Sequence, residues 1–543
     1  MTVEQVDALV IGAGPVGLSA AIQLTRAGVR TLVVERHEAL SRHPKATGVH
    51  PRTMELFRQW GVADAIRDLS VPADHARGFA WTTRLHGGIE LGELMFADGD
   101  TTISPEHTTF TSQDNVETVL YRALPAPVEF RTTAELLDQD DDGVTVALTA
   151  DGSRRIVRAA YVIAADGTKS PTRKALGIAE SATAPYGESV NIFFHSAELS
   201  RLTAASPHLL TWILNADLVG CLLTTGREDR WILNMERDPA LADDAYDNRR
   251  CVQMIRNATG LPTLEPELLS VMRWKHEDAV ADTWRVGRVF LAGDAVHRFP
   301  PHGGFGMNSG IQDVHNLVWK LALVLSGRAS ESLLDTYERE RRPVAVANRE
   351  QVVLNTDRLA ETGWLADDAA IATIETAGGE AVRQAITAGI PAQREQFWSD
   401  GQQFGFLYRS AAVIDDATPP ELSTISVYRP TGHPGARAPH LWLRDGDGVR
   451  RSTIDLSGNG FVVLAGHKGQ SWQAAAAAID VPAVVIGDDL VAESDDFEAL
   501  YGIQPDGAVL VRPDGHVAMR SADATDATAR LEAAMAAILH PAD

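Results

Sequence analysis

Three glycines near the amino terminus, Gly12, Gly14 and Gly17, have the spacing of a nucleotide-binding turn. They follow an apolar run of strand length and precede a helical pattern, and Glu35 ends the next apolar run. Gly12 allows a tight turn, Gly14 lets the backbone approach a pyrophosphate, and Gly17 lets the helix pack on the strand. The start of the helix offers free N–H groups to phosphates, and Glu35 can accept hydrogen bonds from ribose hydroxyls. The motif predicts a site for an ADP-containing dinucleotide, either FAD or NAD.

Two further segments follow apolar strands and carry side chains that could bind the same ligand. DGTKSPTR begins at Asp166 and Gly167, and taken alone it is typical of an ordinary turn. GDAVHRFPPHGGFGMNSGIQD contains Asp294, which can accept hydrogen bonds from a polyol at the carboxyl end of its strand. Two prolines ending at Pro301 predict a rigid loop, and the glycines after them let the backbone approach a flat ligand. Asn308 or Ser309 is expected to cap the helix that follows.

The elements expected around these segments form an α/β pattern. They are, in chain order, a strand at 6–11, a helix ending near Gly28, a strand at 32–34, a hairpin within 140–165, a mostly antiparallel sheet between 186 and 275, a strand at 288–292, a helix from near Ser309 to Gly327 and mainly helical chain over 330–410. Prolines between 419 and 439 predict a linker, and the chain beyond them predicts a separate small α/β unit.

Composition excludes several classes of protein. A chain of 543 residues predicts two to four domains. Its net charge of −24 disfavours nucleic acid as a partner, although it does not describe any single cleft. The only cysteines, Cys221 and Cys251, cannot form a disulfide framework or a cysteine-rich metal site, and we expect buried free thiols. We expect no signal peptide, no membrane span and no metal, and a cytoplasmic enzyme.

In this order, the three segments resemble the FAD-dependent aromatic hydroxylases, the single-component (class A) flavoprotein monooxygenases. PKATGVHPRTMELFRQWG at 44–61, SQDNVETVL at 112–120 and LLDTYERERRPVA at 333–345 match the same family. The carboxy-terminal part is similar to the thioredoxin-like domain of that family. Together with the chain length and LYRSAAV at 407–413, it most resembles hydroxylases that tailor aromatic polyketides.

The resemblance implies three domains in an α/β fold. A Rossmann-like FAD-binding domain of the glutathione-reductase type would span 1–180 and 276–400. An inserted antiparallel-sheet domain for the substrate would span 181–275 with part of 76–105, and the thioredoxin-like domain would span 420–543. No cysteine follows Cys251, so this last domain lacks a CxxC motif and cannot be a dithiol oxidoreductase. A structural, packing or dimer-related role remains.

The resemblance also implies which residues bind the cofactor. They are Gly12, Gly14, Pro15, Gly17, Glu35, Arg36, Lys45, Gln113, Asp166, Gly167, Asp294, Pro301, Gly304, Gly306, Met307 and Asn308. Among them, Arg36 would lie beside the adenosine and Asp294 would hold the ribityl chain and the pyrophosphate region. The helix after the glycine-rich loop would stabilise negative charge on a reduced flavin. Lys45 stands where many members carry arginine, and lysine lacks the bidentate fork of a guanidinium.

The implied reaction is hydroxylation of a polycyclic phenolic or quinonoid aromatic through a flavin C4a-hydroperoxide, in the biosynthesis of an aromatic polyketide antibiotic. FAD is the cofactor, NADPH or NADH the reductant and O₂ the oxidant. Alternatives are a simple-phenol hydroxylase of aromatic catabolism, a Baeyer–Villiger or ring-rearranging oxygenase, and a flavoprotein that does not oxygenate. The partner is a small molecule, with no nucleic acid and no membrane, and the chain is a monomer or a homodimer.

No side chain is expected to be indispensable for the chemistry, because a phenol activates its own ring when it loses a proton. Pro301 and His297 are the catalytic candidates, and His302 could also act on the flavin or on a phenol. A solvent-facing loop position is the alternative for both histidines. Further residues could line a substrate pocket or serve only as core or exposed strand positions: Phe193, Trp212, Trp231, Arg273 and Trp274.

Overall fold

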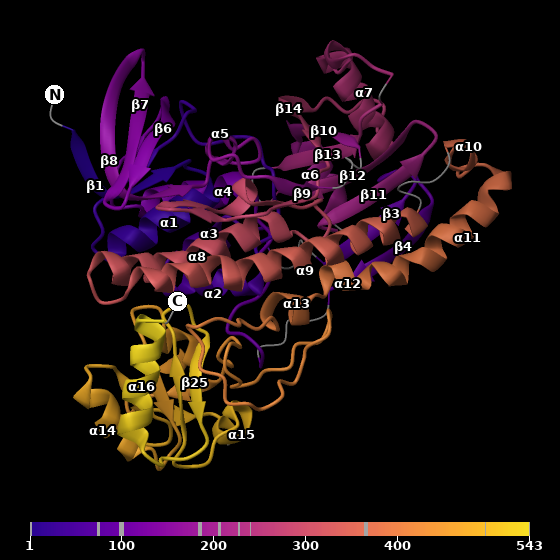
Figure 1. Cartoon of the computed structure of the whole chain (residues 1–543). Coiled ribbons are helices and arrows are strands. Elements are labelled where there is room, and N and C mark those ends of the chain that lie inside the picture. Colours follow the sequence, from indigo (N-terminus) through magenta and orange to yellow (C-terminus); the bar gives the residue numbers. More distant parts are fainter. Residues whose placement is uncertain are drawn as a thin grey trace.

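The computed structural model describes residues 3–72, 77–96, 102–182, 187–204, 208–225, 229–238, 240–362, 368–494 and 496–541. Figure 1 shows two sheets side by side in the upper part of the molecule and a smaller carboxy-terminal unit below them. Two long helices, α8 (Phe305–Leu325) and α9 (Thr336–Leu359), run between the sheets and that unit. The predicted mixed α/β architecture is confirmed. Among the described residues, no helix is long and apolar enough to cross a membrane.

The first sheet has eight strands and a parallel centre. Its central path runs, in spatial order, through β16 (Arg285–Val286), β17 (Val289–Leu291), β8 (Ser153–Ala164), β1 (Glu4–Ile11), β2 (Thr31–Val34) and β5 (Val128–Glu129). The strands from β17 to β5 are parallel, and β17 and the carboxyl half of β1 are continuous apolar runs that are buried. Helices α1 (Pro15–Arg26), α4 (Gln113–Ala123) and α8 pack together beside it. Continuous apolar strands of this kind are typical of a parallel sheet covered on both faces.

The predicted hairpin within 140–165 is confirmed. Strand β7 (Gly143–Ala150) pairs antiparallel with the first half of β8, and the second half of β8 pairs with β1 and β17. Asp151 and Gly152 at the turn both have positive φ, 47° and 78°, as a two-residue hairpin turn of the primed type requires. Strand β6 (Thr132–Asp140) extends this hairpin on the other side of β7.

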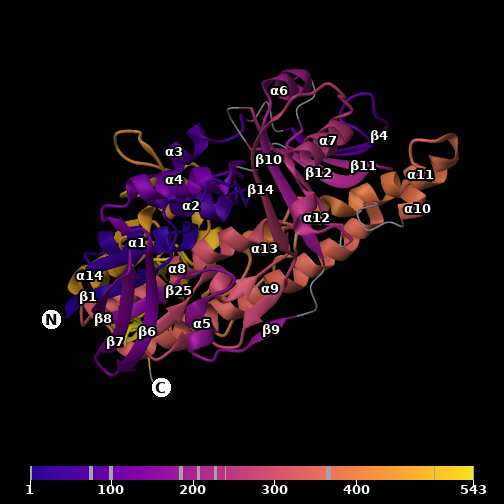
Figure 2. The same ribbon diagram turned by 90° about the horizontal axis from the view of Figure 1, so that it is seen from above.

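The second sheet has seven strands and confirms the antiparallel sheet predicted between 186 and 275. Its spatial order is β14 (Glu267–Lys275), β10 (Glu188–His195), β13 (Arg230–Glu236), β12 (Leu218–Thr224), β11 (Leu210–Asn215), β3 (Gly78–Thr82) and β4 (Glu90–Met95). Only β3 and β11 pair in parallel. The early segment predicted to join this sheet therefore does so through β3 and β4, while 73–76 and 97–101 lie outside the described residues. One face carries α7 (Asn248–Thr259), which lies above the sheet in Figure 1 and overlaps its strands in the view from above in Figure 2.

The helix predicted to begin near Ser309 begins earlier, at Phe305. Gly304 precedes it with φ +72°, and no side chain caps the helix. Asn308 lies inside the first turn, where its amide donates to the carbonyls of Gly48 and Gly304 and accepts from the backbone of His50. The left-handed glycine ends the loop four residues before the expected cap, so the amide of Asn308 joins two loops instead.

The carboxy-terminal unit is built on a four-stranded sheet with the order β22 (Ala483–Val485), β21 (Val462–Ala465), β24 (Ala508–Val511) and β25 (Val517–Ser521). Strands β21 and β22 are parallel and the other pairs are antiparallel. Helices α14 (Gln470–Ala478) and α16 (Ala527–Leu539) pack on one another and share a core with the sheet. The small α/β unit predicted for this part of the chain is confirmed.

The carboxyl half of the proline-rich segment, residues 431–439, is packed against the rest of the protein, so the predicted linker is not a free tether. Arg437 is fully buried and its guanidinium binds Glu55, with 3.0 Å between Nε and Oε2. Glu55 in α2 (Pro51–Gln59) also accepts a hydrogen bond from Arg52 at 2.9 Å. A buried ion pair between segments far apart in sequence holds this stretch of chain in one position.

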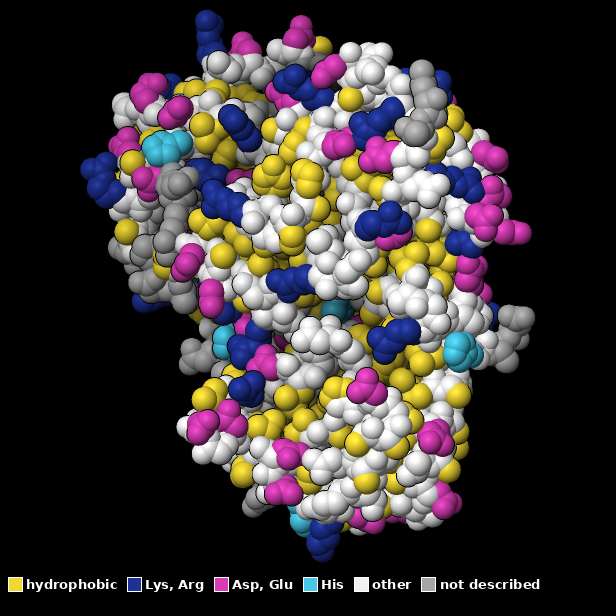
Figure 3. Space-filling model, turned by 90° about the vertical axis from the view of Figure 1, so that its left-hand side faces the viewer, with side chains coloured by type: hydrophobic (Ala, Val, Ile, Leu, Met, Phe, Trp, Pro, Cys, Tyr) yellow, Lys and Arg dark blue, Asp and Glu magenta, His cyan; other side chains and the backbone are white. Residues whose placement is uncertain are grey.

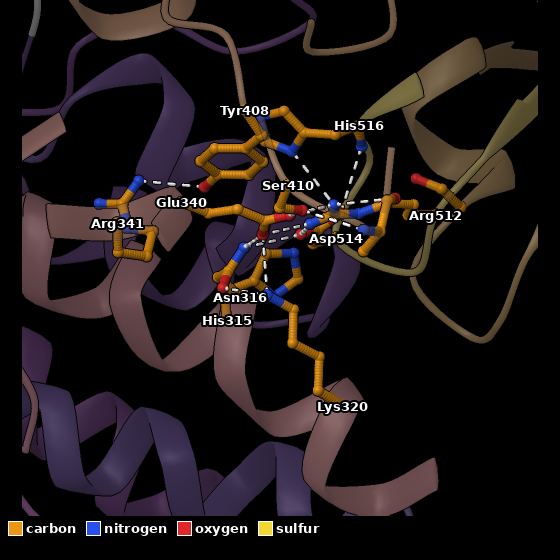
Figure 4. A network of polar contacts seen from close by, with 12 residues as sticks. His315, Asn316, Lys320, Glu340, Arg341, Tyr408, Ser410, Arg512, Asp514 and His516 are labelled. Atoms are coloured by element: carbon orange, nitrogen blue, oxygen red, sulfur yellow. Dashed lines mark hydrogen bonds and ion pairs between the residues drawn. The ribbon is translucent and has the colours of Figure 1, made fainter. Parts of the chain in front are cut away.

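A second buried network joins the carboxy-terminal unit to α8 and α9 (Figure 4). Glu340 of α9 accepts five hydrogen bonds at 2.6–2.8 Å from the side chains of Asn316, Lys320, Ser410 and Arg512. Arg512 follows β24, and its Nε donates to Asp514 at 3.0 Å. Lys320, Glu340 and Arg512 are fully buried, so the unit is docked through charges that are removed from water.

Candidate active site

A cavity of about 1900 Å³ lies between the two sheets and the loops at the carboxyl ends of the parallel strands. Pockets for a single small ligand are typically about 300–1000 Å³, so this one has room for two ligands side by side. Its wall is formed on one side by the glycine-rich loops and on the other by strands of the seven-stranded sheet. The carboxyl edge of a parallel sheet is the usual place for a ligand in such folds.

Ten of the predicted cofactor residues line this cavity: Gly14, Pro15, Lys45, Gln113, Gly167, Asp294, Pro301, Gly304, Gly306 and Met307. The other six are not among the residues that line it: Gly12, Gly17, Glu35, Arg36, Asp166 and Asn308. The structure therefore brings together segments that are separated by up to about 290 positions in the chain. It does not place Arg36 at the cavity, because that side chain is exposed and lies against His37.

The three positions after β1 require glycine for different structural reasons. A Cβ on Gly12 would lie 2.3 Å from the carbonyl oxygen of Ala165, and one on Gly17 would lie 1.9 Å from that of Gly12. Both glycines are therefore required by close backbone packing. A Cβ on Gly14 would meet nothing within 4 Å, and Gly14 lines the cavity. Only Gly14 keeps open a space that a ligand could use.

Glu35 fixes the turn that carries these glycines. Its carboxylate accepts the backbone N–H of Ala13 at 2.8 Å and that of His37 at 2.9 Å. The carboxylate is thereby held at the end of β2, beside the amino terminus of α1, where no side chain caps the helix. Uncapped N–H groups at a helix amino terminus are suited to an anion such as a phosphate.

Arg173 ties the loop after β8 to the loop after β17. Its guanidinium donates to the carbonyl of Ala295 at 2.8 Å and to that of Thr168 at 3.3 Å. Asp166 begins the first loop and accepts the backbone N–H of Thr172 through Oδ2, while its buried Oδ1 has no partner in the part of the chain that the structure describes. Arg173 therefore holds the loop that begins at Asp166 against the loop that contains Asp294.

Asp294 and Lys45 carry charge into the cavity. The Asp294 side chain is open to the cavity and has no hydrogen-bond or ion-pair partner among the described residues. Protein surrounds the carboxyl group, and this desolvation raises its pKa, while the nearby charges of His297 and Lys45 oppose the effect. Lys45 likewise has no carboxylate within 4 Å among the described residues. Two opposite charges left open in this way are suited to a ligand with polyol and anionic groups.

His297 does not lie at the cavity surface. It is fully buried, and its Nε2 lies 2.8 Å from Oδ2 of Asp313. Asp313 also accepts the backbone N–H of Gly293 at 3.2 Å and Nε of Arg341 at 2.9 Å. Neither direct contact with a ligand nor a solvent-facing position fits this geometry, because the ring is enclosed behind the turn that presents Asp294. His297 supports that turn from behind.

The loop between β17 and α8 forms one end of the cavity. Pro301 is exposed to it, and His302 is half-buried and also lines it. Gly303 and Gly304 both have positive φ, 103° and 72°, so this tight loop requires glycine at both positions. His50 holds the loop through a contact of 2.8 Å between its Nε2 and the carbonyl oxygen of Gly303.

The opposite end of the cavity is aromatic. Of the four predicted pocket aromatics, Trp212 and Trp274 line it, whereas Phe193 and Trp231 do not. Trp231 faces away because its neighbour Ile232 takes the cavity side of β13. Sequence reasoning missed further aromatic residues that line the cavity: Phe79, Phe96, Phe110, Phe397, Trp398 and Phe404. Phe79 and Phe397 stack with their ring centroids 3.7 Å apart, although no sequence pattern links these two positions.

Several polar residues also line the cavity. Arg273 is an exposed strand residue that also lines the cavity. Cys221 lines it too, and burial raises the pKa of its thiol to about 12, so the group stays protonated. Burial lowers the pKa of His276 to about 4 and that of His302 to about 3, so both rings are neutral at pH 7. Both cysteines are free and buried, as expected.

One group of possible metal ligands occurs among the described residues, at Asp415, Asp416 and His433. Both ring nitrogens of His433 already face backbone carbonyl oxygens, those of Pro434 and Thr418, at 2.8 and 2.9 Å. Asp416 forms an ion pair with Arg520 at 2.6 Å. The group is therefore used inside the protein, and its donors are not free for a metal.

Charge is mixed on the face of the molecule shown in Figure 3. Lys and Arg side chains are scattered there among acidic and hydrophobic ones rather than gathered into one patch. That face offers no continuous basic surface for a polyanion.

The residues present fit a bound dinucleotide with a flat ring system. The open space at Gly14, the uncapped start of α1 and the open carboxylate of Asp294 all lie at the cavity wall. Asp166, whose Oδ1 has no partner among the described residues, stands between two residues that line the cavity, Ala165 and Gly167. The left-handed Gly304 turns the start of α8 toward the same cavity. The fold and the site together define a dinucleotide-binding protein with an aromatic chamber beside the cofactor region.

Comparison with known proteins narrows this class. The chain matches an FAD binding domain over residues 5–352 and the carboxy-terminal part of an aromatic-ring hydroxylase over residues 431–542. Tetracenomycin A2 monooxygenase-dioxygenase of Streptomyces glaucescens is 36% identical over 580 aligned residues, covering 99% of this chain and 98% of that protein. The chain therefore belongs to the FAD-dependent aromatic-ring hydroxylases, and it is a flavin-dependent aromatic monooxygenase.

Two solved structures are similar to it over nearly their whole length. The flavin-dependent monooxygenase PieE, in complex with FAD and substrate, superposes with a TM-score of 0.90 at 31% identity and covers 98% of this chain and 99% of its own. A ternary complex of aklavinone-11 hydroxylase with FAD and aklavinone superposes with a TM-score of 0.82 at 33% identity, covering 99% of this chain and 100% of its own.

Proposed function

We propose that the protein uses FAD, a reduced nicotinamide cofactor and O₂ to hydroxylate a polycyclic phenolic or quinonoid aromatic in the biosynthesis of an aromatic polyketide. The observation that carries this proposal is the cavity of about 1900 Å³, with open polar groups and glycine loops at one end and aromatic side chains at the other. Tetracenomycin and aklavinone, named with the similar proteins, are of the same chemical type as the proposed substrate.

The FAD would lie along the glycine-loop side of the cavity. The uncapped start of α1 at Gly14 would receive the pyrophosphate, and Glu35 would face the adenosine ribose. Asp294 would accept hydrogen bonds from the ribityl hydroxyls, and the loop from Pro301 to Met307 would lie against the flavin ring. The bound flavin would supply the oxygen-activating redox chemistry. The protein would orient the substrate and exclude water from the enclosed chamber.

The domain division follows from the same proposal. The parallel sheet with 1–180 and 276–400 would form the FAD-binding domain of the glutathione-reductase type, and the seven-stranded sheet would form the substrate domain. The thioredoxin-like interpretation of 420–543 is supported by its four-stranded sheet with one parallel pair and helices α14 and α16. The buried network at Glu340 supports a structural role for that unit.

Anaerobic reduction of the flavin tests this function. The FAD-loaded protein is mixed with NADPH or NADH, with and without a panel of aromatic polyketides, and the visible flavin absorbance is followed. We expect slow bleaching alone and much faster bleaching with one compound, which is then a substrate or a close mimic. Equally fast bleaching with nothing added would point to an oxidase or a reductase, and a protein that binds no FAD would contradict the proposal.

Oxygen labelling separates the remaining reactions. Under ¹⁸O₂, a hydroxylase incorporates one labelled oxygen atom and keeps the carbon skeleton of the aromatic. A lactone or a rearranged ring would indicate a Baeyer–Villiger or ring-rearranging oxygenase, and turnover of small phenols alone would indicate a catabolic hydroxylase. NADPH consumption without any label in the product would exclude oxygenation.

A further inference from the structure

His302 has a fixed orientation and a fixed proton. Its Nδ1 lies 2.8 Å from the hydroxyl oxygen of Thr356, and the same hydroxyl lies 2.9 Å from the carbonyl oxygen of Val352. A hydroxyl has one proton, and the carbonyl can only accept. Both contacts are satisfied when the Thr356 hydroxyl donates to the carbonyl and accepts a proton from Nδ1. The ring then carries its proton on Nδ1, and Nε2 is left as an acceptor.

The unprotonated Nε2 of His302 is open to the cavity. It has no partner among the described residues, and it is not one of their fully buried polar atoms without a partner. His302 itself is half-buried and lines the cavity. A polar ligand atom can therefore reach this nitrogen without displacing a protein group.

His302 also belongs to the loop that forms the cofactor end of the cavity. It follows Pro301 directly in the loop proposed to cover the flavin ring, and Thr356 of α9 holds it from behind. His276, which follows strand β14 of the aromatic half, lines the same cavity. Burial keeps the pKa of His302 far below neutrality, so the ring is an acceptor across the physiological range.

We propose that Nε2 of His302 accepts a hydrogen bond from a phenolic hydroxyl of the aromatic substrate, and that this contact makes the site select a free phenol over its methyl ether. The inference rests on the proposed function, because it needs an aromatic phenol in the cavity. A phenol can donate to Nε2, whereas a methyl ether has no proton to give. An acceptor left without its donor in an enclosed site disfavours the ether. His302 is then a residue that touches the substrate and sets its orientation relative to the loop.

Paired ligands test the selection. The FAD-loaded protein is titrated with 2-hydroxyanthraquinone and 1-naphthol and with the methyl ether of each, and binding is followed by calorimetry. We expect each phenol to bind the wild-type protein about tenfold more tightly than its ether, the effect of one neutral hydrogen bond. In His302→Leu the ratio should fall to about one. His302→Gln, whose carboxamide oxygen can still accept, should retain part of it.

Two further variants separate the contact from general damage. Thr356→Val keeps the volume of the side chain but removes the acceptor that holds the proton on Nδ1, so the ratio should also fall. His276→Gln is the matched control, because His276 lines the same cavity but its Nε2 already lies 2.6 Å from the hydroxyl of Ser189. Its ratio of phenol to ether affinity should equal that of the wild type. If the ratio fell in His276→Gln and not in the His302 variants, His276 and not His302 would be the residue that binds the phenol.

The tautomer can be measured without any substrate. In protein labelled with ¹⁵N in histidine, the resonances lost in His302→Gln should show a protonated Nδ1 and an unprotonated Nε2. A protonated Nε2 would overturn the inference, as would an unchanged ratio in His302→Leu. Those results differ from failure of the proposed function, which would be the absence of ¹⁸O in every product. An enzyme that hydroxylates phenols but binds each phenol and its methyl ether equally well would contradict the inference alone.

Discussion

Two polar regions of this molecule are built in opposite ways. At the docking site of the carboxy-terminal unit, Lys320, Glu340 and Arg512 are fully buried and each charge meets opposite charge (Figure 4). In the cavity, Asp294 and Lys45 have no ion-pair partner within 4 Å among the described residues. Acidic and basic side chains therefore pair with one another in the first region and remain unpaired in the second.

The pKa values of the carboxyl groups follow this difference. Although burial opposes it, the charges of Arg512 and Lys320 hold the pKa of Glu340 well below its usual range. At Asp294 desolvation is the largest influence and raises the pKa, because no cation is close enough to cancel it. An enclosed but unpaired charge is costly in the empty protein and becomes useful when a ligand supplies its partners. The comparison teaches that the unpaired charges mark the functional site and the paired ones mark the structural joint.

Removing Arg512 should break the closed network most severely. In Arg512→Ala, Glu340 and Asp514 keep their charges but lose the guanidinium that bridges them. We expect the free energy of unfolding to fall by about 3–5 kcal/mol, as is usual when one partner of a buried ion pair is removed. Urea unfolding followed by tryptophan fluorescence measures it. Arg451→Ala, which removes an exposed pair with Asp445, should change the stability by less than about 0.5 kcal/mol.

Asp294→Ala should have the opposite effect to Arg512→Ala, because it should weaken FAD binding and leave the stability unchanged. It removes a carboxylate that binds nothing in the protein, so the stability of the FAD-free protein should be retained. Its affinity for FAD should fall about 10–100-fold, because hydrogen bonds to a charged group contribute about 1.5–3 kcal/mol. If Asp294→Ala unfolded the protein, or if Arg512→Ala lost less than about 1 kcal/mol, the contrast between the two regions would be lost.

The buried lysine should give the closed network a pH signature. Desolvation lowers the pKa of Lys320 from 10.5 to about 8, against the opposing charge of Glu340. Between these values the unfolded chain binds the proton and the folded chain does not, so the stability rises with pH across this window. We expect the wild type to gain about 3 kcal/mol relative to Lys320→Met between pH 8 and pH 10.5, at about 1.36 kcal/mol per unit.

Urea unfolding at several pH values measures the difference between the two proteins, which removes the contribution of other groups. Exposed Lys468→Met serves as the control and should follow the wild type at each pH. If the free energies of unfolding of the wild type and Lys320→Met changed in parallel with pH, burial would not lower the pKa of Lys320, and the prediction would be wrong.

Local patterns predict much of the fold. The turn at Asp151-Gly152, the apolar runs of β1 and β17 and the repeated strands of the seven-stranded sheet are all visible in short windows of sequence. The packed proline-rich segment and the buried network are not, because they depend on partners such as Glu55 and Arg437, 382 positions apart. A charged residue in a helical pattern normally reads as solvated, and only the tertiary structure shows that Glu340 is buried.

The candidate site is predicted where backbone geometry forces the residue type. Glycine at positions 12, 17 and 304 is visible for that reason. The aromatic half is not, because Phe79 and Phe397 come from a strand and a helix that no local pattern relates. His297 shows the reverse error, since its position in a loop motif gives no sign that Asp313 encloses it.

The smallest effect on the fold should come from substitution of Gly14, which lines the cavity. Gly17 lies in the same turn, so the two substitutions can be compared directly. Gly17→Ala would put a Cβ 1.9 Å from the backbone oxygen of Gly12, which cannot move without displacing β1. We expect it to lower the free energy of unfolding by about 1–3 kcal/mol. Gly14→Ala adds its Cβ to empty space at φ −74° and should cost less than about 1 kcal/mol.

FAD binding should reverse the order of these two variants. The methyl group of Gly14→Ala would occupy the space where the pyrophosphate must approach the backbone, so the affinity of the folded protein for FAD should fall at least about tenfold. Flavin fluorescence quenching during titration of the FAD-free protein measures it. Gly446→Ala, which also meets nothing within 4 Å but lies in the carboxy-terminal unit, should change neither quantity. If Gly14→Ala bound FAD as tightly as the wild type, the open space at Gly14 would not belong to the cofactor, and the pyrophosphate would have to lie elsewhere along the cavity.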